Sequence, residues 1–339
     1  MRRAIALAGQ SAADVLPNPV VGCVLLGPDG TIVGEGRHQR HGGPHAEVNA
    51  LTAAGAAASG ATAVVTLEPC NHYGNTGPCS QALIAAGVTR VVIGNLDPWL
   101  PAAGGIAVLR AAGIEVVAGV LPDEAADMNR VWLSNVALRR PFVTFKAGIT
   151  LDGRVAAPDG TSKWITSPES RADVHVLRQR VDTMLVGIGT VLADDPLLTV
   201  RADGVPVARQ PLRVVADSAG RTPAGARVRN SDAATWVATA DEVGRDAGGR
   251  LDLAKLLNLL WQRGQRHVLL EGGPTLAAAF FDAGLVDEVV LYAAPKVLGA
   301  GRPVVDGGVA QTLKDAHALD LREVVTIGQD VKLRYAVRR

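Results

Sequence analysis

Short apolar runs alternate with amphipathic segments along the first third of the chain. Residues 20–26 and 31–36 are apolar runs separated by an Asp-Gly turn, which predicts a β-hairpin. Residues 45–58 have helical spacing and helix-forming side chains. Strand-like and helical segments then alternate at residues 61–69, 80–87, 88–95, 105–113 and 114–119. This alternation predicts an α/β fold, with a sheet covered by helices on both faces.

The pattern breaks near residues 130–142, where a basic helix end precedes Pro141. A second series of strand-like and helical segments begins at "FVTFKAGIT" and closes with a strand at "DVKLRYAV". At 339 residues the chain is long enough for two domains. We therefore predict one domain over residues 1–140 and a second over residues 141–339.

The composition narrows the class of protein. Nearly half the residues are hydrophobic, and the formal net charge is +1 with no basic block or acidic tail. A nucleic-acid-binding protein would show a basic face, so we expect a small-molecule substrate and no nucleic acid. No apolar run reaches membrane-spanning length, and residues 1–14 indicate a first helix rather than a signal peptide. Three cysteines do not make a disulfide framework, and we expect a cytoplasmic enzyme.

Two of the three cysteines stand close together, in "LEPCNHYGNTGPC" at residues 67–79. Upstream, His45 and Glu47 form an H-x-E pair at the predicted start of a helix. One imidazole and two thiolates, from His45, Cys70 and Cys79, would give Zn²⁺ three protein ligands and leave the fourth position to water. Zinc lowers the pKa of that water from about 15.7 to about 7. Glu47 would then take and return the proton.

This combination matches the signature of zinc-dependent nucleobase deaminases, H-x-E followed by P-C-x-x-C, except that Cys79 comes later than the second cysteine of that signature. The alternative is a pair of unreactive buried thiols and a histidine that caps a helix. The joint presence of Glu47 and Pro69 favours the metal site.

The motifs "HAEV" and "TLEPCNHYGNTGPC" resemble those of the bifunctional riboflavin-biosynthesis deaminase/reductases. In the second half, the segments "FKAGITLDGR", "SKWITS", "GTVLADDPLLTVR" and "LLEGGPTLA" carry the resemblance, which covers almost the whole chain. It implies a cytidine-deaminase-like three-layer α/β/α domain followed by a dihydrofolate-reductase-like α/β domain. It also implies a homo-oligomer.

The resemblance further implies two reactions on a phosphorylated pyrimidine. The first is zinc-dependent hydrolytic deamination of 2,5-diamino-6-(5-phosphoribosylamino)pyrimidin-4-one, with Glu47 as the catalytic residue. The second is hydride transfer from NADPH to C1′ of the ribosyl group, which opens it to a ribitylamino chain. The deaminase residues that the resemblance places against the substrate are Asn18, His38 and His72.

For the second half, the resemblance implies substrate contacts, cofactor contacts and two supporting residues. The implied substrate contacts are Ser162, Arg178, Leu198, Arg201 and Glu271. The implied cofactor contacts are Gly148, Trp164, Thr190, Asp194, Gly273, Pro274 and Thr275. Lys146 and Asp152 have supporting roles. The arginines suit the substrate phosphate, and a helix that starts at Pro274 can hold a cofactor phosphate on its backbone NH groups.

Each of these residues also has a structural interpretation. Gly272-Gly273 can form an ordinary turn, and Trp164 can be a core aromatic. Asp194-Asp195-Pro196 can likewise be only a turn, and the two arginines can be solvated surface charges. The ordered match of four segments, rather than any single residue, favours the functional interpretation.

The chain departs from the family pattern at Asn75, where Lys or Arg is usual, at Gly77, and in "DPWLPAAGG" at residues 97–105. A basic residue at position 75 would suit the substrate phosphate. These departures leave open a reductase whose deaminase half binds zinc but is inactive, or a scaffold. A cytidine- or tRNA-type deaminase with an added domain is a further alternative, and the Cys70–Cys79 spacing, the balanced charge and the reductase-like half argue against it.

Overall fold

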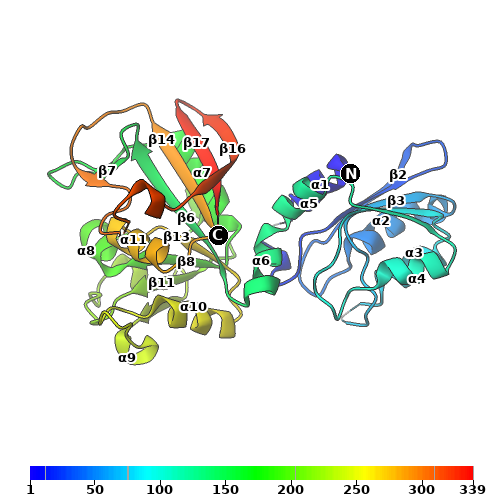
Figure 1. Ribbon diagram of the computed structural model, residues 1–339, viewed down its shortest axis with the longest axis horizontal. Coiled ribbons are helices and arrows are strands. Elements are labelled where there is room, and N and C mark those ends of the chain that lie inside the picture. The colour runs from blue at the N-terminus through cyan, green and yellow to red at the C-terminus, as the bar shows by residue number, and fades with distance from the viewer. Residues whose placement is uncertain (12, 75, 203, 309, 339) are drawn as a thin grey trace. The chain divides into compact units, whose positions relative to one another are not determined.

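The computed structural model of the chain describes residues 1–11, 13–74, 76–202, 204–308 and 310–338. They form two compact units, Met1–Arg139 and Arg140–Arg339, each with its own sheet and hydrophobic core (Figure 1). None of the helices in these ranges combines the length and the apolar character needed to cross a membrane.

The first unit is built on a five-stranded sheet with the order β2-β1-β3-β4-β5. Its strands are β1 (Gly22–Leu26), β2 (Ile32–Arg37), β3 (Thr62–Leu67), β4 (Arg90–Asn95) and β5 (Glu115–Ala118). Its helices are α1 (Arg2–Ala8), α2 (Ala46–Ala54), α3 (Cys79–Ala85), α4 (Gly105–Ala111), α5 (Pro122–Met128) and α6 (Arg130–Leu138), with 3-10 turns η1 (Ala13–Val15) and η2 (Gly55–Ala58). The predicted hairpin is β1–β2, and β3, β4 and β5 run parallel.

Alternate residues of β1 face two different layers of helices. Cys23 and Leu25 contribute to the core that α2, α3 and α4 cover, whereas Val24 packs with Ala4 and Leu7 of α1 on the opposite face. Successive side chains of a strand point to opposite faces, so this placement makes the unit a three-layer α/β/α sandwich, as expected. The helix predicted over residues 45–58 ends earlier, because Gly55 has a φ of 54° and the last turn becomes η2.

The second unit is built on an eight-stranded sheet with the order β12-β11-β8-β13-β6-β14-β17-β16. The strands of this sheet are β6 (Phe142–Thr150), β8 (Thr183–Gly187), β11 (Leu212–Ala216), β12 (Thr235–Ala238), β13 (His267–Leu270), β14 (Glu288–Ala294), β16 (Leu319–Ile327) and β17 (Asp330–Val337). Two small ribbons accompany it, made of β7 (Arg154–Ala156) with β15 (Arg302–Pro303), and of β9 (Arg201–Ala202) with β10 (Val205–Pro206).

The helices of the second unit follow its strands in the crossover pattern of a parallel sheet. They are α7 (Pro168–Gln179), α8 (Ile188–Asp194), α9 (Ala240–Val243), α10 (Leu253–Gln262) and α11 (Pro274–Asp282), with 3-10 turns η3 (Arg227–Arg229) and η4 (Leu313–Asp315). The strands from β12 to β14 run parallel, and β17 and β16 are antiparallel. Ligand sites in such sheets form beyond the carboxyl ends of the parallel strands.

Candidate active sites

Three side chains that can bind a metal converge in the first unit at the starts of two helices. His45 is the N-cap of α2, Cys79 is the first residue of α3, and Cys70 follows β3. His45 Nδ1 lies 3.3 Å from Cys79 Sγ and 3.5 Å from Cys70 Sγ. In a tetrahedral zinc site, bond lengths of about 2.0–2.3 Å put neighbouring ligand atoms about 3.6 Å apart. The cluster therefore fits zinc in both donor chemistry and spacing.

The pKa values of the two thiols shift in opposite directions. Hydrogen bonding from Cys79, helped by His45, lowers the pKa of the Cys70 thiol in spite of its burial. The hydrogen bond to Cys70, together with burial, raises the pKa of the Cys79 thiol. Cys70 therefore loses its proton more readily than Cys79. The thiolate is the form in which cysteine binds a metal.

Glu47 lies two residues beyond His45 on α2 and is 3% exposed. Burial, with the neighbouring charge of Cys70, raises the pKa of Glu47 to about 7. A carboxyl group with this acidity can both accept and donate a proton near neutral pH, which is what an acid/base residue must do. Among the described residues, the convergent metal-binding group consists of His45, Cys70 and Cys79, which leaves Glu47 for the acid/base role.

Asn18 and His38 lie together beside the metal-binding cluster. The rings of His38 and His45 are 5.3 Å apart and meet edge to face. His38 Nδ1 is 3.0 Å from the carbonyl oxygen of Pro44, and His38 Nε2 is 3.3 Å from Asn18 Nδ2. A carbonyl can only accept, so Nδ1 carries the proton and Nε2 accepts from the Asn18 amide. This arrangement makes His38 neutral, and burial lowers its pKa in agreement.

His72 lies in the segment between the two cysteine ligands. Its ring meets the Trp99 ring edge to face, with 5.4 Å between the ring centroids. Its Nδ1 atom is buried and makes no hydrogen bond within the described parts of the chain. Asn75, in the same segment, lies outside the described residues.

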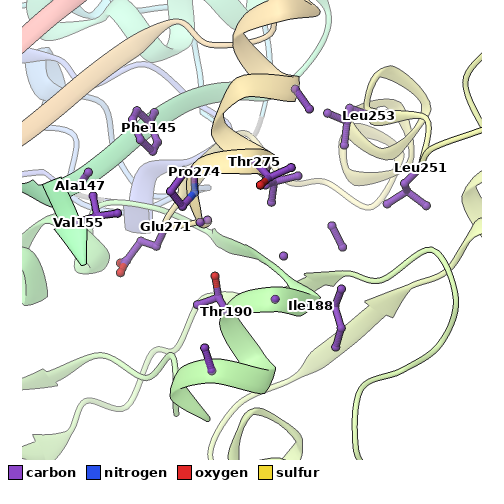
Figure 2. Close-up of a pocket in the computed structure, with 18 of the residues that line it drawn as sticks. Phe145, Ala147, Val155, Ile188, Thr190, Leu251, Leu253, Glu271, Pro274 and Thr275 are labelled. Atoms are coloured by element: carbon purple, nitrogen blue, oxygen red, sulfur yellow. The ribbon is translucent and has the colours of Figure 1, made fainter. Parts of the chain in front are cut away.

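A separate cavity of about 830 Å³ lies in the second unit, at the carboxyl ends of its parallel strands (Figure 2). Figure 2 shows Phe145, Ala147, Val155 and Glu271 on one side of this cavity, with Ile188, Leu251 and Leu253 on the other. Nine of the predicted site residues line it: Lys146, Gly148, Ser162, Thr190, Asp194, Glu271, Gly273, Pro274 and Thr275. The fold thus brings together residues that lie up to 129 positions apart in the sequence.

The start of α11 forms one edge of the cavity. Gly273 is the N-cap of this helix and Pro274 its first residue, and no side chain caps the helix. Figure 2 shows Pro274 and Thr275 at the first turn, with the Thr190 side chain on the opposite side of the cavity. A Cβ atom added at Gly273 would lie 3.5 Å from Thr190 Oγ1, in ordinary van der Waals contact, so the N-cap backbone and the Thr190 hydroxyl are close neighbours. An uncapped helix start beside glycines fits the diphosphate of a dinucleotide.

Comparison with known proteins places both units in one family. Residues 141–333 match the model of the RibD C-terminal domain, and residues 1–95 match the cytidine and deoxycytidylate deaminase zinc-binding region. The riboflavin biosynthesis protein RibD of Escherichia coli is 43% identical, over 98% of this chain and 97% of its own length. The chain belongs to the RibD family.

Solved structures of RibD proteins agree with this assignment. Acinetobacter baumannii RibD, form 1, superposes with a TM-score of 0.85 at 37% identity, over 100% of this chain and 98% of that chain. A Thermotoga maritima protein, described as a diaminohydroxyphosphoribosylaminopyrimidine deaminase/5-amino-6-(5-phosphoribosylamino)uracil reductase, gives a TM-score of 0.88 at 35% identity, covering 100% and 97%. The expected fold class, a deaminase-like domain followed by a dihydrofolate-reductase-like domain, is confirmed.

Five of the residues predicted for the second unit of this RibD-family chain do not line the cavity. They are Asp152, Trp164, Arg178, Leu198 and Arg201. The carboxylate of Asp152 accepts hydrogen bonds from the backbone of Leu298 and Gly299 and so fixes a loop, and its supporting role stays a prediction. The Leu198 side chain is 4% exposed and belongs to a hydrophobic cluster, so any contact with substrate would fall to its backbone.

The remaining three each contact a different part of the second unit. Trp164 is 64% exposed and stacks under the guanidinium of Arg171 at 4.4 Å, so it is not the core aromatic of the structural interpretation. Arg201 donates from Nε to Thr199 Oγ1. Arg178 is held by Glu271, a cavity residue. Their contact roles stay predictions.

The cavity also contains polar residues that the sequence analysis misses. Ser218 and Arg221 follow β11, and Arg250 lies between α9 and α10. The buried carboxylate of Asp217 organises the β11 turn by accepting from the backbone and the hydroxyl of Thr222. The Asp-Ser pair directly after a buried strand is the signal that could have pointed to this turn.

Proposed function

We propose that this chain catalyses two consecutive reactions of riboflavin biosynthesis. Residues 1–140 deaminate 2,5-diamino-6-(5-phosphoribosylamino)pyrimidin-4-one with the help of zinc, and residues 141–339 reduce the ribosyl group of the product with NADPH. The observation that carries the proposal is the presence, in one RibD-family chain, of both the His45–Cys70–Cys79 cluster with buried Glu47 and a separate cavity around Glu271 and Gly273.

In the deaminase unit, His45, Cys70 and Cys79 would hold zinc, which when bound would supply a water with a pKa lowered toward about 7. Glu47 takes a proton from the attacking water and delivers it to the departing 2-amino group. The ring carbon exchanges its bond to nitrogen for a bond to oxygen, and ammonia leaves. His38 holds the amide of Asn18 by the hydrogen bond described above, so that Asn18 presents its oxygen in a fixed orientation to the pyrimidine.

In the reductase unit, NADPH supplies a hydride to C1′ of the sugar. The uncapped start of α11, with Gly273 and Thr275, binds the cofactor diphosphate, and Arg221 and Arg250 lie where they can bind its additional phosphate. Lys146 faces the same cavity beside Glu271. When C1′ is reduced and the sugar ring opens, Lys146 donates a proton to the ring oxygen.

The proposal includes a cytoplasmic, homo-oligomeric enzyme with no nucleic-acid partner. All three cysteines, Cys23, Cys70 and Cys79, are free thiols, which suits a reducing compartment. The substrate is a small phosphorylated pyrimidine, consistent with the near-neutral charge of the chain.

Incubation of the purified chain with the diaminopyrimidine substrate, with and without NADPH, tests both steps. We expect the deaminated uracil alone without NADPH, and the ribitylamino product when NADPH is added, each identified by mass. Glu47→Gln keeps the ligand set and should reduce ammonia release by roughly 10²–10⁴-fold while leaving reduction of a supplied uracil intermediate unchanged. Reduction without deamination would establish a reductase with an inactive deaminase half. Release of ammonia from cytidine or tRNA instead would establish a cytidine- or tRNA-type deaminase with an added domain.

A further inference from the structure

An indole side chain contacts one of the predicted substrate-binding residues of the deaminase site. Trp99 is 44% exposed, and its ring makes the edge-to-face contact with His72 at 5.4 Å. The same His72 ring has a buried nitrogen, Nδ1, that makes no hydrogen bond within the described ranges. A polar atom in this situation is satisfied when a ligand or water reaches it.

The loop that carries Trp99 is fastened at several points to the residues on either side of Cys70. The Glu68 carboxylate accepts from the backbone NH groups of Asp97, Gly104 and Ile106, at 3.3, 3.1 and 3.2 Å. On the other side of Cys70, the backbone NH of Asn71 donates to the carbonyl of Ala102 at 2.9 Å. The backbone of this loop is therefore tied to the segment that contains His72.

The backbone of Trp99 is also fixed within its own loop. Its NH donates to Asp97 Oδ1 at 2.7 Å, and its carbonyl accepts from the NH groups of Ala102 and Ala103. Ala102 in turn packs against the thiol ligands Cys70 and Cys79. Among the described residues, the ring partner of Trp99 is His72.

We propose that Trp99 is a positioning residue of the deaminase site, which holds the His72 imidazole so that a ring nitrogen of His72 binds the pyrimidine substrate. The inference rests on the proposed deaminase function. Trp99 acts through His72 and does not itself contact the substrate. An edge-to-face aromatic pair restricts the imidazole to one plane, which prepares the hydrogen bond before the substrate arrives.

The first test compares Trp99→Ala and Trp99→Phe in steady-state deamination. Loss of the aromatic pair should lower kcat/KM by roughly two- to tenfold, mainly through a higher KM, because the lost interaction positions a binding group. Trp99→Phe keeps an aromatic edge and should remain within about twofold of the wild type. Zinc content and the rate of reduction of a supplied uracil intermediate should not change in either variant. An unchanged KM in Trp99→Ala, in a chain whose wild type deaminates, would overturn the inference alone.

The second test is a double-mutant cycle with His72→Ala. If Trp99 acts only through His72, then Trp99→Ala should change deamination by less than about twofold in the His72→Ala background. If Trp99→Ala lowers deamination as much in the His72→Ala background as in the wild type, the indole contacts the substrate directly, and this result overturns the positioning role. Trp99→Leu, tested in parallel, fills space without an aromatic ring. If both Trp99→Ala and Trp99→Leu lose zinc, Trp99 is a structural support of the metal site and the proposal is wrong. A wild-type chain that releases no ammonia would instead refute the proposed function.

Discussion

Glu271 and Arg178 form a bidentate ion pair, with Arg178 Nε and Nη2 donating to the two carboxylate oxygens at 2.7 and 2.8 Å. Lys146 Nζ lies 3.5 Å from the same carboxylate. Burial alone would raise the pKa of Glu271, but the two cations outweigh burial and hold the pKa well below its usual range. One carboxylate with two cations leaves a net positive charge beside the cavity, and this charge suits a phosphorylated substrate.

Glu271→Gln should destabilise the second unit. The substitution leaves Lys146 and Arg178 close together without their shared negative charge, and removing one partner of a buried pair costs about 3–5 kcal/mol. The folded pKa is lowered, so the contribution of Glu271 is present in full above the unfolded pKa of 4.5 and is lost as the pH falls toward the folded pKa. Denaturant unfolding should therefore show a large difference from wild type at pH 7 that narrows below about pH 4.5.

Glu323→Gln is the control for this comparison. Glu323 is 45% exposed and also pairs with an arginine, Arg334. Its replacement should leave the unfolding midpoint and the reductase rate close to wild type, because exposed ion pairs contribute little. Equal effects of the two substitutions on the unfolding midpoint would contradict the role that we give to the triad of Glu271, Arg178 and Lys146.

The individual members of the triad are predictable from the sequence, but their pairing is not. Arg178 lies in α7 and Glu271 follows β13, 93 positions away, so only the fold brings them together. The same limit applies to Trp99 and His72, which lie on separate loops. Sequence motifs indicate what a residue can do, whereas contacts between distant segments depend on packing.

The strand pattern succeeds where one face of an element is buried. The β1–β2 hairpin and the alternation from β3 to β5 follow the apolar runs closely. No strand is predicted over residues 319–327, where the structure has β16, an edge strand whose residues are mostly exposed. Apolar and polar residues alternate from Leu319 to Arg322, but the register against β17 shifts between Leu321 and Glu323, so the alternation does not continue over the whole strand.

Removal of zinc should separate the two activities. The metal-binding cluster belongs to the first unit and the cavity around Glu271 and Gly273 to the second. Dialysis against a strong chelator, or Cys70→Ser, should abolish ammonia release while NADPH still reduces a supplied uracil intermediate. Restored ammonia release after zinc is added back to the chelated wild type is the control. A parallel loss of both activities would show that the metal supports the reductase unit as well.

Arg221→Gln should change the preference between NADPH and NADH. Arg221 lines the cavity beyond β11. A guanidinium that binds a phosphate typically contributes about 1.5–3 kcal/mol to the binding free energy. The Arg221 side chain is exposed, so we expect a contribution at the lower end of this range. We expect Kd for NADPH to rise about tenfold and Kd for NADH to stay within about twofold, measured by calorimetry. Arg227→Gln, an exposed arginine that does not line the cavity, is the control. A similar rise for both cofactors would remove Arg221 from the phosphate site.

Gly105→Ala should weaken zinc binding, although Gly105 is not one of the metal ligands. Gly105 opens α4, and a Cβ atom there would lie 1.8 Å from the carbonyl oxygen of Pro69, the residue before Cys70. The backbone carbonyl cannot rotate away as a side chain can, so either α4 or the Cys70 segment must move. Displacement of one thiol should lower zinc affinity at least about tenfold, as changes beside metal ligands commonly do.

Gly77→Ala provides the matched control for Gly105→Ala. Gly77 lies between the two cysteine ligands, its ideal Cβ meets nothing within 4 Å, and its φ is not in the left-handed region. Competition with a fluorescent chelator should therefore give wild-type zinc affinity for Gly77→Ala and a clear loss for Gly105→Ala. Because α4 is also tied to Glu68, the displaced helix start should carry the Trp99 loop with it and reduce deamination even at saturating zinc. Wild-type affinity in Gly105→Ala would mean that α4 moves independently of Cys70.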